Sequence, residues 1–241
     1  MKLISLLLSF LLLTVQPAQA VVMVNFGQSS ESFSSLWSEN WSGTDGDWTE
    51  TLGDPDTSYT ATITGYTEDL YLGAKAASAD QELYRVFSMT TAGAIANFRF
   101  KLKCADLPTS TGSRNIAILK TGTSAPRAHF YMAYSSGVKF TTTAFGGSTS
   151  TVTTSTLSTN TEYWVHGRYQ KGSGSNAKAS ISFGPTWPVP TSSDAAYTES
   201  TNGTATADAT YFYLGGDNYN IATSSYNCEI GTVEYWETST W

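Results

Sequence analysis

The sequence predicts an all-β protein, folded as an antiparallel two-sheet β-sandwich. Three observations support this prediction. Helical periodicity is almost absent after residue 20, many short segments alternate apolar and polar residues, and Gly, Ser, Asn or Pro separates nearly all of these segments. Many short antiparallel strands in one chain of this length are typical of sandwiches and barrels.

The first twenty residues, MKLISLLLSFLLLTVQPAQA, have the features of an export signal. Lys2 precedes an apolar run from Leu3 to Val15, and the small residues of AQA follow it. We therefore expect cleavage after Ala20, a mature single domain of residues 21–241, and a secreted or periplasmic location. The apolar run is shorter than a membrane-spanning helix requires, so we expect no membrane insertion of the mature form.

The charge balance argues against a nucleic-acid partner. Removing Lys2 from 13 basic residues leaves 12, against 20 acidic residues, so the mature chain has a net charge of −8. Binding to a phosphate backbone requires a basic patch, which an acidic chain of this kind does not offer.

The clearest expected strand is residues 94–104, AIANFRFKLKC. Phe98, Phe100 and Cys104 share one face of this strand, and charged residues fill most of the other face. In an oxidising compartment Cys104 and Cys228 are candidates for a disulfide, and two separate buried thiols are the alternative.

Similar alternation predicts the other strands, and tight turns are expected at YSSGV and KGSGSN. Segments 34–58 and 184–208 lack the alternation, so we expect loops there and no domain boundary. In chain order, the expected strands are residues 58–63, 68–73, 81–89, 94–104, 114–120, 127–134, 137–145, 148–157, 161–170, 176–183, 209–215 and 227–237.

Two segments near the C-terminus, FYLGGDNYN (212–220) and EIGTVEYWE (229–237), resemble the end of a laminin-G-like jelly-roll domain. Such domains belong to the concanavalin A-like lectin and glucanase superfamily. NIAILKTG and FYMAYSSGVKF are similar to the middle of the same domains. The resemblance covers about residues 80–237. It implies a jelly-roll sandwich, and it bears only weakly on function because it consists of hydrophobic pattern and glycines.

Calcium is the one cofactor that the sequence suggests. Asp217, Asn218 and Asn220 are candidate ligands, and relatives of the resembled type often hold calcium at the rim of the sandwich, which supports this candidate. A second acidic segment could also offer oxygen ligands, with a solvated loop as the alternative interpretation. With only two histidines and no HExxH motif, a zinc site is not expected. The carboxylates of the second segment are Asp45, Asp47, Asp54 and Asp56.

Glycoside hydrolysis by the mechanism of this superfamily is not expected. The reaction needs two carboxylates across a cleft, and the resembled glucanases carry them on one strand as E-x-D-x-E or a close variant. The nearest candidates here are Glu229, Glu234 and Glu237. Glu229 and Glu234 are five residues apart, so strict alternation predicts that they lie on opposite faces.

The leading functional hypothesis is a carbohydrate-binding or surface-recognition module without catalysis, with a glycan or cell-surface polysaccharide as its partner. Polar and aromatic residues alternate along segments 127–131 and 164–168, and we expect both sets on one shared face. Sugar rings stack on aromatic faces, and polar side chains hydrogen-bond their hydroxyls. The predicted ligand-binding residues are Arg127, His129, Tyr131, His166, Arg168 and Tyr219.

The alternative is a polysaccharide lyase that acts on uronates by β-elimination. YFYLGGDNYN is similar to the YFKAGxYxQ segment of alginate lyases, which implies that Tyr219 is catalytic together with Arg85 and His129. The sequence departs from that pattern, because Tyr213 stands where the family has Lys and Arg127 where it has Gln. A third hypothesis is a purely structural extracellular protein, in which these polar residues make ordinary cross-strand pairs.

Overall fold

The computed structural model describes residues 35–41, 47–52, 56–74, 81–91, 93–109, 112–192, 194–215 and 226–241. The chain divides into two compact units, Met1–Phe33 and Ser34–Trp241, and all described residues belong to the second unit. The predicted export signal lies outside the described residues. In the part that is described, no helix is long and apolar enough to cross a membrane.

The described residues form fifteen strands and no helix, which confirms the all-β prediction. The strands are β1 (Trp37–Glu39), β2 (Trp48–Leu52), β3 (Asp56–Thr60), β4 (Glu68–Ala74), β5 (Glu82–Val86), β6 (Ile95–Asp106), β7 (Ser113–Thr121), β8 (Ala125–Tyr134), β9 (Val138–Ala144), β10 (Glu162–Gln170), β11 (Ala177–Gly184), β12 (Tyr197–Gly203), β13 (Tyr211–Gly215), β14 (Tyr226–Ile230) and β15 (Val233–Thr238).

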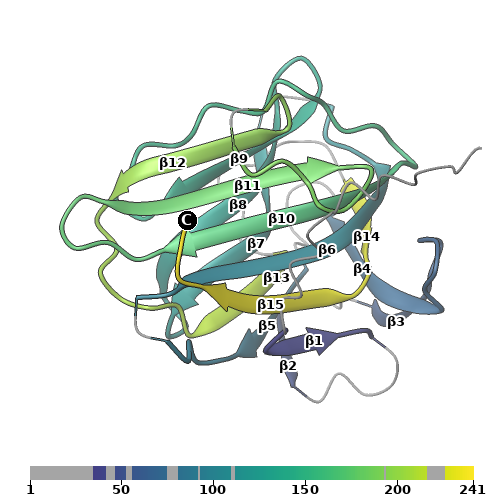
Figure 1. The fold of residues 1–241 in the computed structure, drawn as a ribbon. Coiled ribbons are helices and arrows are strands. Elements are labelled where there is room, and N and C mark those ends of the chain that lie inside the picture. Colours follow the sequence, from purple (N-terminus) through teal and green to yellow (C-terminus); the bar gives the residue numbers. More distant parts are fainter. Residues whose placement is uncertain are drawn as a thin grey trace, which may run out of the picture. The chain divides into compact units, whose positions relative to one another are not determined.

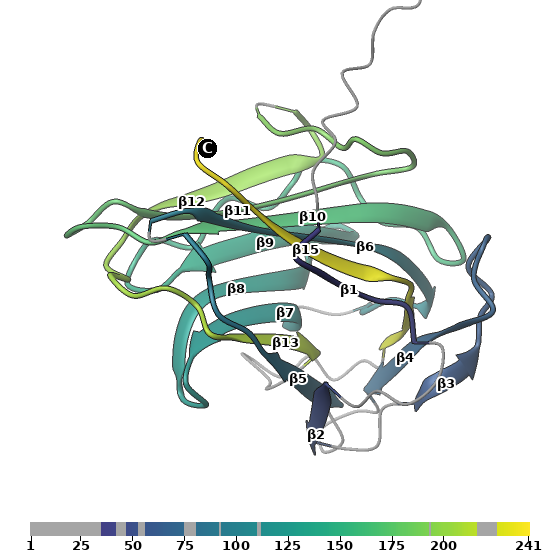
Figure 2. The same cartoon turned by 60° about the horizontal axis from the view of Figure 1, so that its bottom comes forward.

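These strands make two antiparallel sheets (Figure 1). The nine-stranded sheet has the order β12-β11-β10-β6-β14-β4-β3, and β15 pairs with both β6 and β1. The six-stranded sheet has the order β2-β5-β13-β7-β8-β9. Figure 2 shows strands of the two sheets as stacked layers, which is the predicted sandwich.

The core lies between the layers and consists of the alternate side chains that each sheet turns inward. Phe98 on β6 packs with its ring centroid 4.9 Å from that of Phe130 on β8 and 4.9 Å from that of Phe212 on β13. Opposite Phe98 on β10 is Gly167, where an added Cβ would meet the Phe98 ring at 2.0 Å. Gly167 therefore makes room for the aromatic contact that joins the two sheets.

The predicted disulfide is confirmed. Cys104 on β6 and Cys228 on β14 lie directly opposite each other in the register and are bonded. They are 124 residues apart in sequence, and closing a loop of that length stabilises a fold by at most ~5 kcal/mol in the chain-entropy model.

The expected strand at 148–157 does not form, although its backbone follows the edge of β9. Backbone bonds join Ser150 to Thr142 and Thr153 to Phe140. In the return direction the amides of Thr142 and Phe140 donate to the hydroxyl oxygens of Ser150 and Thr153 instead of to carbonyls. Hydroxyl groups thus replace half of a strand ladder, as Ser and Thr side chains are able to do.

Two segments expected to be loops contain strands. β12 lies within 184–208, and β1 and β2 lie within 34–58. β1 has only three residues and pairs with β15, which is far away in sequence, and β12 is the edge strand of its sheet. Pairing rather than local alternation therefore determines them.

The expected strand at 227–237 is divided into β14 and β15 around Gly231 and Thr232. This break changes the alternation, so the prediction that Glu229 and Glu234 lie on opposite faces is wrong. Glu229 is paired with Lys103, and Glu234 is paired with Arg99, and both pairs point outward from the nine-stranded sheet. The Glu229 carboxylate accepts hydrogen bonds from Thr62, and Glu234 lies 2.6 Å from Arg99 Nε.

Candidate functional site

The structure divides the predicted ligand-binding residues between two outward faces. His129 and Tyr131 lie on β8 and point outward from the six-stranded sheet, because Phe130 between them is buried in the core. His166 and Arg168 lie on β10 and point outward from the nine-stranded sheet. The sheets meet core to core, so the predicted single shared face is wrong. Alternation predicted the outward direction within each strand, but it carried no information about which sheet the strand joins.

The His166 imidazole is covered by its own chain. Its ring stacks on Trp236 with centroids 5.3 Å apart, and Trp187 from the β11–β12 connection packs edge-on at 5.4 Å. His166 Nε2 lies 3.3 Å from Asn97 Oδ1. Burial, together with the positive charges of Arg168 and Arg99, lowers the pKa of His166 to about 3. A neutral, enclosed imidazole of this kind contributes to packing rather than to ligand contact.

Arg168 also contacts the residues that cover the outward face of the nine-stranded sheet. Its Nε donates to Ser180 Oγ at 3.0 Å, and its Nη2 donates to the Thr191 carbonyl at 3.0 Å. Its guanidinium carbon lies 4.5 Å from the ring centroid of Trp241. The buried guanidinium thus ties the β11–β12 connection and the last residue to the sheet.

Arg85 does not accompany His129. In the register Arg85 lies opposite Phe212 and Trp48, both core residues, so its side chain points to the inner side of the six-stranded sheet. There its guanidinium carbon lies 4.7 Å from the ring centroid of Trp37, and its Nη2 lies 2.6 Å from an Asp47 oxygen. The implied pairing of Arg85 with His129 in one catalytic group is therefore wrong.

Arg127 is the extra residue of a β-bulge, because its neighbours on β8 pair with adjacent residues of β7. Its Nε donates to Thr121 Oγ1 at 2.9 Å, and its guanidinium carbon lies 5.9 Å from the Phe145 ring centroid. It is half-buried, and its side chain contacts Thr121 and Phe145. The bulge therefore removes it from the regular alternation that placed it beside His129.

The remaining predicted residues lie outside the description. Tyr219, Asp217 and Asn218 fall within 216–225, so their proposed roles stay predictions. In the second acidic segment, Asp47 is engaged with Arg85. Across the part of the chain that the structure describes, no group of three His, Cys, Asp or Glu side chains is placed to hold a metal ion.

His129 is held by two neighbours on the outward face of the six-stranded sheet. Its Nδ1 lies 3.2 Å from the side-chain oxygen of Asn115, and its ring stacks on Tyr131 with centroids 5.5 Å apart and planes 8° from parallel. The amide oxygen only accepts, so the proton belongs on Nδ1 and Nε2 is the basic nitrogen. Burial and the nearby charge of Lys120 lower the pKa of His129 to about 4. The imidazole is therefore neutral at pH 7.

A second aromatic group occupies the same face. Tyr84 on β5 and Tyr211 and Tyr213 on β13 have ring centroids 5.1–6.3 Å apart, and Lys120 Nζ lies 3.7 Å from the Tyr213 ring centroid. We call these four residues the tyrosine patch. Burial and neighbouring Glu82, with the other two tyrosines, raise the pKa of Tyr213 to about 12. Sequence reasoning missed the patch because its members come from three strands, although the alternation of Tyr211 and Tyr213 was visible.

The tyrosine patch and His129 belong to one line across the sheet. Tyr84 is paired with Tyr213, Tyr213 with Ile118, and Ile118 with His129. This line runs perpendicular to the strands, from β5 to β8. Because adjacent strands are ~4.8 Å apart, Tyr213 and His129 are separated by roughly 10 Å.

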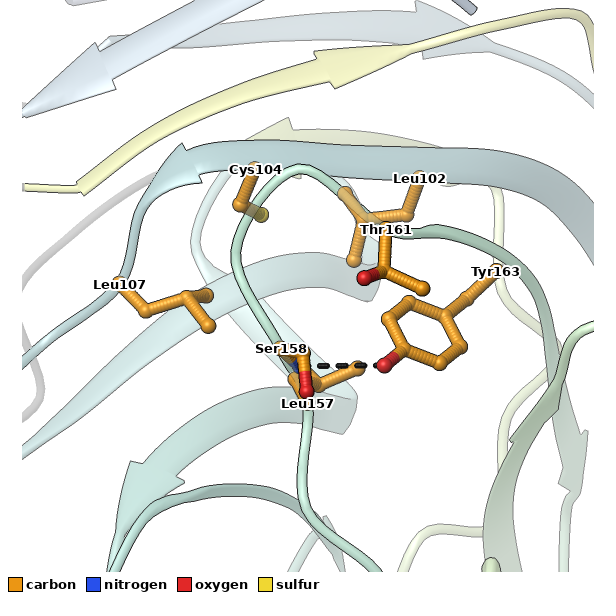
Figure 3. A pocket seen from close by; sticks show the side chains of 7 residues that line it. All are labelled: Leu102, Cys104, Leu107, Leu157, Ser158, Thr161 and Tyr163. Carbon is orange, nitrogen blue, oxygen red and sulfur yellow. Dashed lines mark hydrogen bonds between the residues drawn. The ribbon is translucent and has the colours of Figure 1, made fainter. Parts of the chain in front are cut away.

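The small depression in Figure 3 is not part of this face. It lies beside the disulfide, and the Ser158 amide donates to the Tyr163 hydroxyl across it at 3.1 Å. The depression is too narrow to admit a water molecule. Its lining residues are Leu102, Cys104, Leu107, Leu157, Ser158, Thr161 and Tyr163, and none was predicted to bind a ligand.

No family model matches the sequence, and no curated protein matches it. Among solved structures, the chain is similar to an endo-β-1,4-glucuronan lyase from the fungus Trichoderma reesei. The TM-score is 0.54 at 13% identity, covering 85% of this chain and 96% of that chain. It is also similar to the marine PL-14 alginate lyase from Aplysia kurodai, with a TM-score of 0.55 at 7% identity, covering 85% of this chain and 100% of that chain.

A third structure, described as HCR/D-Sa-GBL1/C, matches with a TM-score of 0.50 at 9% identity over 78% of this chain. The match spans 43% of that protein, so this chain corresponds to less than half of its length. At these identities the comparisons show a shared fold. They are compatible with the predicted concanavalin A-like jelly roll.

Proposed function

We propose that the protein is a glycan-binding module whose ligand lies on the outward face of the six-stranded sheet. The observation that carries the proposal is the half-exposed ring of His129, stacked on the buried Tyr131 and in line with the half-exposed Tyr84 of the tyrosine patch. Aromatic rings and neutral polar groups in one row provide both kinds of contact that a sugar ring makes.

The opposite face supports this choice by contrast. Trp187 and Trp241 already pack over the side chains of the nine-stranded sheet, and arginines stack on both rings. On the six-stranded sheet, Tyr84, Tyr211 and His129 keep part of their surface exposed.

The fold comparisons and the disulfide support the same proposal. The two lyases are named for glucuronan and alginate, which are polymers of acidic sugars. A disulfide persists in oxidising compartments, so we propose that the glycan is met outside the cytoplasm.

Binding of the purified protein to a glycan array tests the proposal. We expect binding to at least one glycan class, and we expect His129→Ala to reduce it about tenfold or more, the effect of one hydrogen bond and one ring contact. Lys178→Ala, on the outward face of the other sheet, is the matched control and should bind like the wild type. An array without binding, or equal loss in both variants, would contradict the proposal.

A second candidate function is β-elimination on a uronate polymer, for which His129 supplies an imidazole that is neutral at pH 7. In this reaction a base takes the C5 proton, the bond between C4 and the glycosidic oxygen breaks, a C4–C5 double bond forms, and the leaving oxygen gains a proton. A neutral imidazole with its proton on Nδ1 offers Nε2 as that base. The group that protonates the leaving oxygen would be Tyr219, as the sequence predicts.

Ultraviolet absorbance of the unsaturated product distinguishes the two functions. Incubation with glucuronan or alginate should raise the absorbance if the protein is a lyase, and His129→Gln should abolish the rise. Glycan binding without any rise leaves the module non-catalytic.

A further inference from the structure

The tyrosine patch carries a positive charge on an aromatic surface. Lys120 is the last outward-pointing residue of β7 and pairs with Tyr211 in the register. Its ammonium nitrogen lies 3.7 Å from the Tyr213 ring centroid. Only 14% of the Lys120 side chain is exposed. The ammonium is thus held in place by the rings rather than extended into solvent.

In the described part of the chain, this ammonium forms an ion pair with the carboxylate of Glu82. The distance from Lys120 Nζ to Glu82 Oε2 is 3.9 Å, which is an ion pair but longer than a hydrogen bond. An ammonium has three donors, and Glu82 Oε2 at 3.9 Å is too far away to accept a hydrogen bond from any of them. An incoming anionic oxygen would therefore find both a charge and hydrogen-bond donors at this position.

The tyrosine patch is accessible to solvent on the side of β5. Val86 pairs with Tyr211 and is 58% exposed, one of the most exposed large apolar side chains in the described part of the protein. Tyr84 and Tyr211 are themselves half-buried. A sugar ring can therefore approach the patch from the side of β5, next to the lysine.

His129 lies two strands further along the same line. The separation of roughly 10 Å from Tyr213 is larger than one sugar ring, so the two positions would contact different, non-adjacent rings of an extended oligosaccharide. Lys120 also acts electrostatically on His129, since its charge contributes to the low pKa of that imidazole. The two groups thus behave as neighbouring parts of one surface.

We propose that the tyrosine patch is a subsite for an acidic sugar, in which the rings of Tyr84 and Tyr211 support the pyranose and Lys120 binds its carboxylate. This inference rests on the proposed glycan binding and specifies the ligand as a uronate-containing oligosaccharide. The oligosaccharide runs across the strands, with one sugar ring on the tyrosine patch and another sugar ring at His129.

Two tetrasaccharides that differ only in the group at C6 test the subsite. Glucuronan tetrasaccharide carries a carboxylate where cellotetraose carries a hydroxymethyl group, so titration calorimetry with both isolates the contribution of the carboxylate. We expect the wild type to prefer the glucuronan tetrasaccharide by roughly tenfold, as for a charge-assisted hydrogen bond. Lys120→Met should remove the preference, whereas Lys120→Arg should retain it.

Lys101→Met is the matched control. Lys101 lies on the outward face of the other sheet, also 3.9 Å from a carboxylate, that of Glu162, and also near an aromatic ring, that of Tyr66. This variant should keep the preference. Tyr211→Ala should weaken both tetrasaccharides equally, because stacking does not depend on charge. Thermal unfolding of each variant shows whether it is folded.

The outcomes separate the subsite from the proposed function. Equal affinity of the wild type for both tetrasaccharides, or a preference that survives in Lys120→Met, overturns the uronate subsite and leaves glycan binding intact. If neither tetrasaccharide binds while the array is positive, the subsite is again overturned. If the array is negative as well, the proposed function also falls.

Discussion

The side-chain oxygen of Asn115 lies 3.2 Å from Nδ1 of His129, across the pairing of β7 and β8. Asn115 is 1% exposed, and a bulge directly after it puts it opposite Tyr131 rather than Met132 in the register. The amide therefore reaches diagonally to the imidazole, and this contact determines which ring nitrogen carries the proton.

Replacing this amide by a carboxylate should raise the pKa of His129. In the wild type the pKa is about 4 because burial and Lys120 disfavour the imidazolium. Asn115→Asp adds a negative charge at hydrogen-bond distance, which favours the charged ring, and we expect a rise of roughly 1–3 units. An NMR titration of the ring protons measures it. The chain has only two histidines, so His166→Gln assigns the signals. An unchanged titration would show that Asn115 does not contact the ring.

Acid should destabilise the fold before its carboxylates titrate. The folded pKa values of His129 and His166 are about 4 and about 3, below the ordinary value of 6.5. Between those values and 6.5 the unfolded chain binds protons that the folded chain does not bind. The free energy of unfolding therefore falls as the pH is lowered through this range, by up to ~1.4 kcal/mol per pH unit for each histidine.

Urea unfolding at pH 7 and pH 5 measures this dependence. His166→Gln should reduce the slope, since it removes one of the two imidazoles that stay neutral in the folded chain over this range, although it will also cost stability at both pH values. The same slope in the wild type and in a variant that lacks both histidines would assign the acid sensitivity to other groups.

The sequence predicted the sandwich because alternation is a local property of each strand. The inward direction of Phe98, Phe100 and Cys104 on β6 and the bridge to Cys228 are confirmed. Whether a strand joins one sheet or the other depends on its partners, which no local pattern records. This is why His129 and His166 were expected on a shared face and lie on opposite faces.

The candidate site was predictable only in part for the same reason. His129 and Tyr131 share one strand, and their common outward direction followed from their spacing. Lys120 and Tyr213 meet only through the pairing of β7 with β13. Bulges moved Arg127 out of the expected alternation, and the break at Gly231 placed two glutamates on one face.

Adding a methyl group at Gly167 should disrupt the contact between the sheets. The new Cβ would lie 2.0 Å from the Phe98 ring, so Gly167→Ala forces that ring out of its packing with Phe130 and Phe212. Overpacking of this kind costs about 1–3 kcal/mol or more. Chemical denaturation measures the loss. In the double variant with Phe98→Leu the two changes should be less than additive, because the smaller side chain yields space. Simple additivity would contradict the role given to Gly167.

Arg85 offers the sharpest distinction between stability and ligand binding. Its guanidinium lies on the inner side of the six-stranded sheet, 2.6 Å from Asp47 and stacked on Trp37, whereas His129 points outward from the same sheet. Arg85→Met should therefore lower the free energy of unfolding. Loss of one partner of a mostly buried pair costs up to 3–5 kcal/mol, and the exposure of Asp47 reduces that to about 1–2 kcal/mol. Glycan affinity of the folded fraction should stay within about twofold of the wild type. A variant that keeps its stability but loses binding or lyase activity would place Arg85 against the ligand, and it would require a different arrangement of β5.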